Sequence, residues 1–178
     1  MTSEEITDLE LGKAAEHLVV ADLILSGYRA YLTEQGLPYD VVIDFEGNLY
    51  RVQVKASRCA KRIPQRATVA KGYLYNVRRA GKGGRRQYAD NEFDIVALVA
   101  MDLRIVAYLP FKGRILQTIY LRPPGHQSSA RTTRTRTIDQ FPIEAAMAVL
   151  MGTRPILSPK AEPVRITPND QGRLFEIA

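Results

Sequence analysis

The sequence predicts an α/β fold in which a mixed β-sheet is flanked by helices. Three observations predict it: apolar residues at helical spacing near the N-terminus, short strand-like segments after them, and an apolar run at residues 93–100. The chain has 178 residues and is 46% hydrophobic. A chain of this length buries a sizeable core without disulfides or a structural metal.

The first expected element is a helix at residues 7–25. Thr7 and Glu10 have the spacing of a capping box, and Gly27 suits the left-handed conformation that ends a helix. Glu16 lies inside this helix on a partly apolar face. A carboxylate buried on such a face requires a cation or a hydrogen-bond donor nearby. Glu16 is therefore a candidate functional residue, and a solvated surface position is the alternative.

Three short strands are expected next, at residues 28–32, 39–45 and 49–56. A turn at residues 46–48 joins the second and third into a hairpin. Asp40 lies at the start of the second strand, whereas Gln53 and Lys55 share one face of the third because side chains alternate along a strand. The hairpin can therefore place Asp40 near Gln53 and Lys55.

The rest of the chain is expected to contain two more strands, at residues 93–100 and 104–110, and a short helix that begins at Pro142. We divide the chain into a folded domain at residues 1–121, a basic flexible loop or linker at 122–137, a C-terminal helix at 138–152 and an extended tail at 153–178.

The charges are distributed unevenly along the chain. The formal net charge is +6, from 25 Lys and Arg residues against 19 Asp and Glu residues. Residues 1–46 contain ten acids and two bases, whereas residues 47–89 contain twelve bases and no acid. Such a basic stretch attracts a polyanion. The alternative is that these charges only solvate a surface.

The composition excludes several kinds of site and location. Cys59 is the only cysteine, which excludes an intrachain disulfide, and His17 and His126 are too few and too distant to indicate a zinc site. No apolar run approaches the length that spans a bilayer, and the N-terminus is acidic, unlike a secretory leader. We expect a cytoplasmic protein without membrane contact, associated with the nucleoid if it is bacterial.

The proposed hairpin carries groups that suit magnesium. Mg²⁺ prefers carboxylate, carbonyl and water oxygens, which Asp40, the Gln53 side chain and the Val54 backbone carbonyl would supply. Lys55 is suited to orient an attacking water or to offset developing charge. The expected reaction is phosphodiester hydrolysis with Mg²⁺, for which Mn²⁺ is the expected substitute.

In sequence order, Glu16, Pro38-Tyr39-Asp40 and Gln53-Val54-Lys55 resemble the site pattern of the PD-(D/E)XK nuclease superfamily. The pattern is most similar to the branch of group I intron homing endonucleases, in which Q-x-K replaces E-x-K, and the likeness covers residues 9–112. The resemblance implies a restriction-endonuclease-like core and a Mg²⁺-dependent endodeoxyribonuclease, with residues 1–121 as the nuclease-like domain.

The resemblance also implies roles for individual residues. Glu16, Asp40, Gln53 and Lys55 correspond to the catalytic positions, and the implied metal ligands are Asp40, Gln53, the Val54 carbonyl and Glu16. Gln53 departs from the commoner pattern, because a neutral amide contributes one acceptor oxygen and no charge. Two interpretations therefore stay open: a working variant site, which we favour, or a decayed one.

Basic residues around this site are candidates for DNA contact, because arginine and lysine neutralise phosphates. The candidates are Arg51, Arg58, Lys61, Arg62, Arg78, Arg79, Lys82, Arg85, Arg86, Arg131, Arg134 and Arg136. Tyr73 and Tyr75 are expected to be half-buried strand residues, not base-stacking rings. Asp94 is expected to have a structural role, such as pairing with a basic residue.

The C-terminal segment contains Gln171-Gly172-Arg173-Leu174-Phe175. It is similar to the Q-x-x-L-F pentapeptide by which many bacterial DNA-processing proteins bind the replicative sliding clamp. Gln171, Leu174 and Phe175 are therefore candidate clamp-binding residues. We favour the alternative, a tail segment that folds back as an edge strand, because so short a pattern arises readily by chance.

These features together predict a metal-dependent DNA endonuclease. Because one site cuts one strand, a double-strand break would require a homodimer or a higher homo-oligomer. Two alternatives stay open. One is a catalytically inactive nucleic-acid-binding protein of the same fold, and the other is an RNA-binding or RNA-processing factor, since a basic surface does not distinguish the two polymers.

Overall fold

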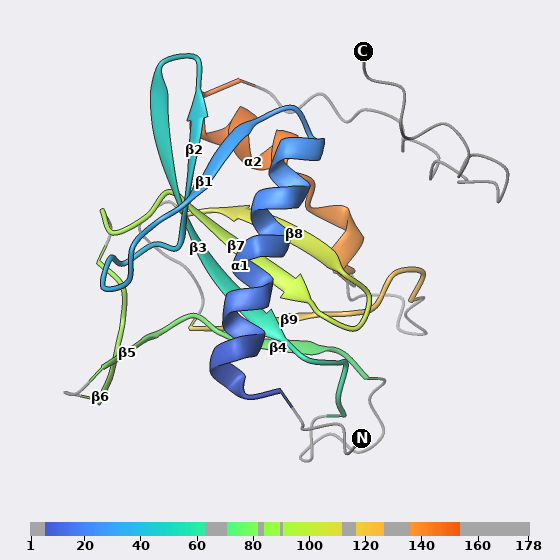
Figure 1. The fold of residues 1–178 in the computed structure, drawn as a ribbon. Coiled ribbons are helices and arrows are strands. Elements are labelled where there is room, and N and C mark those ends of the chain that lie inside the picture. The colour runs from blue at the N-terminus through green and yellow to red at the C-terminus, as the bar shows by residue number, and fades with distance from the viewer. Residues whose placement is uncertain are drawn as a thin grey trace, which may run out of the picture.

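The computed structural model of the protein describes residues 6–62, 71–81, 84–89, 91–111, 117–126 and 136–153. At its centre is a five-stranded sheet in the order β1-β2-β3-β7-β8 (Figure 1). Its strands are β1 (Arg29–Leu32), β2 (Val41–Phe45), β3 (Asn48–Ser57), β7 (Ile95–Ala100) and β8 (Ile105–Pro110). Strands β3 and β7 are parallel and the other neighbouring pairs are antiparallel. The predicted mixed sheet is therefore confirmed.

The helices lie over one face of this sheet. They are α1 (Asp8–Leu25) and α2 (Ile143–Leu150), the second preceded by a short 3-10 helix (Ile138–Gln140). The opposite face is covered by an antiparallel ribbon of β4 (Tyr73–Asn76) and β9 (Thr118–Leu121). A separate hairpin of β5 (Arg79–Gly81) and β6 (Gly84–Arg86) extends away from the sheet (Figure 1). Within the described ranges, no helix has the length and hydrophobicity of a membrane span.

Helix α1 begins and ends as the sequence predicts. Thr7 Oγ1 accepts a hydrogen bond from the Glu10 N–H at 3.2 Å, and Glu10 Oε2 accepts one from the Thr7 N–H at 2.7 Å, which completes the capping box. At the other end Gly27 has a φ of 87°. The Tyr28 N–H donates to the Leu23 carbonyl at 3.0 Å, the bond that closes a Schellman motif.

Strand β3 changes its partner along its length. Its first half pairs antiparallel with β2, and its second half pairs parallel with β7. The turn between β2 and β3 consists of Glu46 and Gly47, whose φ values of 51° and 76° suit a two-residue hairpin turn. Strand β2 begins at Val41, opposite Val52. Beyond Val52, β3 therefore has no β2 residue beside it.

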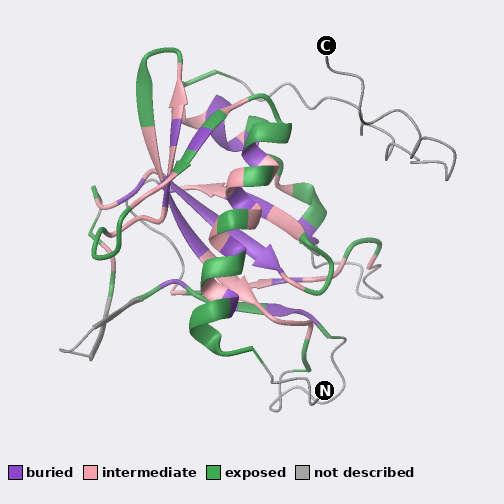
Figure 2. Ribbon diagram, in the orientation of Figure 1, coloured by how far each residue is buried: buried purple, intermediate pink, exposed green. Residues whose placement is uncertain are grey.

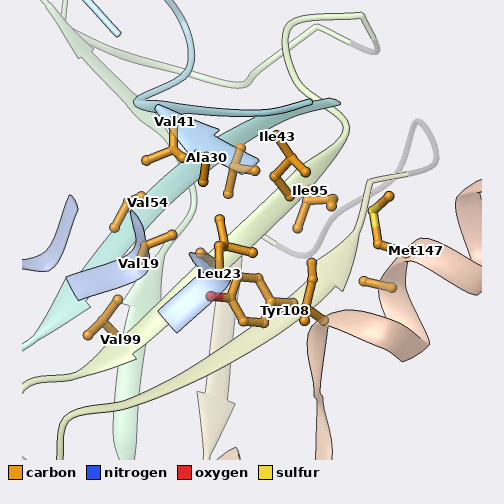
Figure 3. Close-up of a cluster of buried hydrophobic side chains, with 14 of the residues drawn as sticks. Val19, Leu23, Ala30, Val41, Ile43, Val54, Ile95, Val99, Tyr108 and Met147 are labelled. Carbon is orange, nitrogen blue, oxygen red and sulfur yellow. The ribbon is translucent and has the colours of Figure 1, made fainter. Parts of the chain in front are cut away.

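The sheet separates two hydrophobic cores, because side chains along β7 point alternately to the two faces of the sheet. All six residues of β7 are buried (Figure 2). One core lies beneath α1 and α2 and includes Leu23 and Ile95 (Figure 3). The other lies beneath the β4–β9 ribbon and contains Tyr73 and Tyr75, each 1% exposed. The structural role predicted for these two rings is confirmed.

One polar contact joins α1 to β8 at the edge of the first core. The Tyr108 hydroxyl donates to Asp22 Oδ2 at 2.7 Å, and Tyr108 is 2% exposed. Burial raises the pKa of Asp22, and the hydrogen bond from Tyr108 partly offsets this effect. This hydrogen bond joins α1 to β8 of the sheet on which the helix packs.

The C-terminal part of the described chain packs against β8. Met147 of α2 is buried in the first core, and the Tyr108 N–H donates to the Phe141 carbonyl at 2.8 Å. The two ends of the predicted linker meet in a bridge between Arg122 and Thr137. The middle of that linker and the predicted tail from residue 154 lie outside the described residues.

Gly72 is required where the chain enters β4. A Cβ atom at Gly72 would lie 2.4 Å from Tyr120 Cζ and 2.8 Å from the Leu121 carbonyl oxygen. Because that carbonyl belongs to the backbone, Gly72→Ala should lower the free energy of unfolding in urea by about 1–3 kcal/mol.

The matched control is Gly12→Ala in α1, where an added Cβ meets no atom within 4 Å. Alanine is the better helix former, so this change should raise stability by up to about 1 kcal/mol. Equal unfolding midpoints for the two variants would contradict the close packing at Gly72.

Candidate active site

Asp40 lies at the point where β2 and β3 separate. Its backbone N–H donates to the Val52 carbonyl at 2.9 Å, and its Oδ2 accepts a hydrogen bond from the Val54 N–H at 2.7 Å. The carboxylate thus takes the place of a β2 residue beside β3. Burial raises the pKa of Asp40. The hydrogen bond from Val54 opposes this shift, and the negative charge of Glu16 reinforces it.

The Gln53 side chain joins the same group. It is 6% exposed, and its Nε2 donates both to Asp40 Oδ2 and to the Val54 carbonyl, the latter at 3.1 Å. One NH2 group therefore lies between two oxygens that the sequence analysis identified as candidate metal ligands. A half-turn of the amide exchanges its nitrogen and oxygen and would present a third oxygen there. The residues therefore fit a cation that prefers oxygen ligands.

Glu16 reaches the same region from α1. Together with Asp40 it lines a hollow of about 170 Å³ between α1 and residues 33–37, and its carboxylate lies 2.9 Å from Lys13 Nζ. Across the part of the chain that the structure describes, no three His, Cys, Asp or Glu side chains group closely enough to hold a metal ion. A metal site here would therefore depend on the Gln53 amide and the Val54 carbonyl as well as on carboxylates.

Lys55 lies two residues beyond Gln53 along β3. Its Nζ donates a hydrogen bond to the Tyr88 hydroxyl oxygen at 3.1 Å and lies 5.4 Å from the centre of the Tyr88 ring. Burial lowers the pKa of Lys55, and the negative charge of Asp40 opposes this shift. Shifted pKa values in neighbouring acidic and basic groups are typical of functional sites.

Tyr88 is a residue of this region that the sequence analysis missed. It lies 33 residues beyond Lys55 in the chain, in a segment that contains other tyrosines and many basic residues. No local pattern therefore distinguishes it. The signal that could have found it is physical, since a half-buried lysine needs an acceptor for its ammonium hydrogens.

Arg51 has a structural partner. Its Nε and Nη2 each donate to a carboxylate oxygen of Asp94 at 3.0 Å, and its backbone N–H donates to Asp94 Oδ2 at 2.8 Å. Its Nη1 also donates to the Asn91 carbonyl. The expected structural role of Asp94 is confirmed. The guanidinium of Arg51, one of the candidates for DNA contact, is thus used within the fold.

A larger hollow of about 840 Å³ lies beside the first turns of α1. It extends from Lys55 to the outer face of the β4–β9 ribbon, where Leu74 and Tyr120 line it. Three of the basic candidates also line it: Arg58, Lys61 and Arg62. Arg58 Nη2 lies 3.6 Å from Asp8 Oδ1. This hollow therefore offers positive charge next to Lys55.

The structure describes the remaining basic candidates only in part. Arg78 donates to the Gln117 side chain, and Arg136 is exposed. The backbones of Arg79, Arg85 and Arg86 belong to the β5–β6 hairpin, whereas their side chains are not among the described groups. Outside the described residues lie Lys82, Arg131 and Arg134 and the candidate clamp-binding residues Gln171, Leu174 and Phe175.

A comparison with protein-family models matches residues 7–143 to the model described as PD-(D/E)XK endonuclease. The chain belongs to the PD-(D/E)XK endonuclease family. The matched range contains Glu16, Asp40, Gln53 and Lys55, the residues on which the resemblance rests, so the predicted family is confirmed. The comparison with curated proteins found no match.

The fold of this PD-(D/E)XK endonuclease is similar to that of the bacterial homing endonuclease I-Ssp6803I. The TM-score is 0.61 at 19% sequence identity, and the match covers 83% of this chain and 96% of that chain. At this level of identity the likeness concerns the fold. It confirms the restriction-endonuclease-like core that the sequence resemblance implied.

Replacing Arg51 tests whether its pair with Asp94 holds β3 and the start of β7 together. Arg51→Gln leaves a half-buried carboxylate without its bidentate donor and should lower the free energy of unfolding by about 1–3 kcal/mol. The control is Arg62→Gln at an exposed position, for which a change below about 0.5 kcal/mol is expected. If urea unfolding shows equal stability for both variants, the pair does not have this structural role.

Proposed function

We propose that the protein is a metal-dependent DNA endonuclease that hydrolyses phosphodiester bonds. The observation that carries the proposal is the convergence of the Asp40 carboxylate, the Gln53 amide and the Val54 carbonyl, with the ammonium group of Lys55 close to Asp40. Phosphodiester hydrolysis needs groups that bind a cation and groups that stabilise developing negative charge. Membership of an endonuclease family supports the same reaction class.

Asp40, Gln53 and the Val54 carbonyl would hold Mg²⁺, with Mn²⁺ as a substitute, and Glu16 would support the ion from α1. When bound, the metal polarises the scissile phosphate and lowers the pKa of a water ligand. The raised pKa of Asp40 suits this role. A carboxylate whose charge is poorly compensated by its surroundings gains more from a cation than a solvated one does.

Lys55 would act on the water that attacks phosphorus. Its Nζ would orient that water through a hydrogen bond and offset the negative charge that develops on the phosphate oxygens. Because Lys55 is half-buried, its charge acts on the phosphate more strongly than that of a fully solvated lysine would. Asp40 and Lys55 would therefore have complementary tasks at the scissile phosphate.

The basic residues beside the site favour DNA as the substrate. Residues 47–89 contain twelve bases and no acid. Arg58, Lys61 and Arg62 line the hollow that begins at Lys55, so phosphates next to the scissile one would follow this hollow. Each neutralised phosphate releases counterions. DNA binding should therefore weaken steeply as the salt concentration is raised.

A catalytically inactive nucleic-acid-binding protein of the same fold is the second candidate function. The observation that favours it is the Gln53 amide, which brings no charge to the metal site and donates a hydrogen bond to Asp40. We favour the active enzyme because Glu16, Asp40 and Lys55 surround the same region. An RNA substrate would use the same basic surface.

The cleavage assay uses duplex, nicked and branched DNA and duplex RNA, each with Mg²⁺. The wild type should cut at least one DNA substrate. Lys55→Ala should bind that substrate with similar affinity but cut it at least about 100-fold more slowly, because it lacks the group that assists the water.

Arg29→Ala is the control for the loss of one positive charge, since Arg29 is exposed on the edge strand β1. It should cut at the wild-type rate. A wild type that binds DNA and cuts no substrate with Mg²⁺ or Mn²⁺ would establish the binding-protein alternative instead. Cleavage of RNA alone would replace DNA as the proposed substrate.

Gln53→Glu should strengthen Mg²⁺ binding and weaken the metal-free fold. The new carboxylate adds a charged ligand, but it cannot donate to Asp40 or to the Val54 carbonyl, and without a cation it repels Asp40. We expect at least about tenfold tighter Mg²⁺ binding by calorimetry. The melting temperature without metal should fall and should recover when Mg²⁺ is added.

The control for this charge change is Gln140→Glu, at an exposed position in the 3-10 helix. It adds the same charge away from Asp40 and should show neither effect. Unchanged Mg²⁺ affinity in Gln53→Glu would remove Gln53 from the metal site.

Further proposals concern partners and location. Cleavage of both strands by a chain with one site would require a homodimer or a higher homo-oligomer. Gln171, Leu174 and Phe175 are the residues that would bind a sliding clamp, and an edge strand formed by the same segment stays the favoured alternative. A DNA substrate would place the protein in the cytoplasm, with the nucleoid in a bacterium.

A further inference from the structure

Tyr88 lies in the connection between the β5–β6 hairpin and β7, next to Lys55. Its hydroxyl oxygen accepts the hydrogen bond from Lys55 Nζ at 3.1 Å, and the centre of its ring is 5.4 Å from the same nitrogen. Both contacts favour the ammonium form of lysine, because a hydroxyl oxygen accepts its hydrogens and the face of an aromatic ring attracts a cation. Burial acts in the opposite direction on Lys55.

The position of the Tyr88 ring is determined by its neighbours. It packs edge-on against Phe93, with ring centroids 4.9 Å apart and an interplanar angle of 83°, and Phe93 packs against Phe111 at 4.5 Å. Both phenylalanines are buried. Such packed aromatic rings have few alternative rotamers, so Tyr88 offers Lys55 an acceptor at a fixed point.

The same connection is also attached to β3 through Arg51. The Arg51 side chain bonds to Asp94 and to the Asn91 carbonyl. Along β3, Arg51 and Lys55 have the same phase, because side chains two and four residues apart lie on one face. This face of the strand therefore carries the attachment of the connection and the lysine that Tyr88 contacts.

We propose that Tyr88 is a positioning residue that holds the Lys55 ammonium group in place for phosphodiester hydrolysis. This inference rests on the proposed nuclease function and names a residue that acts through Lys55. Without the hydroxyl, Nζ would lose an acceptor at a fixed distance and would sample other rotamers. The rate of the chemical step should fall although DNA still binds. A small displacement of the group that assists the attacking water is enough to slow the reaction strongly.

The test compares Tyr88→Phe with the wild type. Phenylalanine keeps the ring, its edge contact with Phe93 and its face toward Lys55, and it removes only the hydroxyl group. Tyr31→Phe is the matched control, because it makes the same chemical change on β1 at a residue that is 55% exposed. Both variants should keep the wild-type melting temperature and DNA affinity.

The first measurement does not require activity. The chain contains seven lysines, so the ¹³Cε resonances of labelled lysine can be followed by NMR at neutral pH, with Lys55→Arg to assign the Lys55 signal. In Tyr88→Phe the Lys55 side chain should become more mobile, with a lower ¹³Cε order parameter, because the ammonium group loses an acceptor at a fixed point. The other six lysines, and Lys55 in Tyr31→Phe, should keep the wild-type order parameters.

The second measurement is the single-turnover cleavage rate at saturating DNA, measured together with the DNA affinity. In Tyr88→Phe the single-turnover rate should be roughly tenfold lower, with the DNA affinity unchanged. Tyr88→Leu, which also removes the ring, should lower the rate further.

The outcomes separate this inference from the proposed function. Unchanged mobility of the Lys55 side chain in Tyr88→Phe overturns the positioning role. A wild-type single-turnover cleavage rate in that variant also overturns it. A wild type that never cuts, with a more mobile Lys55 in Tyr88→Phe, would support the contact while refuting both the nuclease function and the catalytic role assigned to Tyr88.

Discussion

The hydrogen bond from the Val54 N–H to the Asp40 carboxylate is the contact on which the rest of the site depends. It forms because β2 begins at Val41 and leaves the adjoining part of β3 without a strand on that side. A shielded backbone N–H requires an acceptor, and here the acceptor is an acidic side chain. At the same open edge, the Val54 carbonyl accepts a hydrogen bond from the Gln53 amide. The separation of two strands thus brings a carboxylate, an amide and a carbonyl to one point.

Burial then sets the chemical character of these groups. It raises the pKa of Asp40 and lowers the pKa of Lys55, so in both residues the charged form is disfavoured by the surroundings. A cation beside Asp40 would stabilise its carboxylate form, and a phosphate beside Lys55 would stabilise its ammonium form. The two hollows beside α1 differ in the same way: Glu16 and Asp40 line the smaller one, and four basic residues line the larger one, where Asp8 is the acidic residue.

Local sequence patterns predicted most of the fold because their causes are local. The capping box at Thr7 and the turn at Glu46-Gly47 each involve residues within one turn of chain. The hairpin register follows from that turn and explains why Asp40 and Gln53 could be placed together. In contrast, Arg51 meets Asp94 across 43 residues, and Lys55 meets Tyr88 across 33. Those contacts depend on the parallel pairing of β3 with β7, which no local pattern specifies.

The sequence by itself determined which groups are available for chemistry, the strand phase of Gln53 and Lys55, and the family to which the chain belongs. Only the tertiary structure decided that the Arg51 guanidinium is used within the fold, that Tyr88 contacts Lys55, and that a ribbon covers the sheet opposite α1. The physical reason is that strand alternation and turn geometry are properties of short segments. Burial, ion pairing and the position of a distant ring arise only when separate elements pack together.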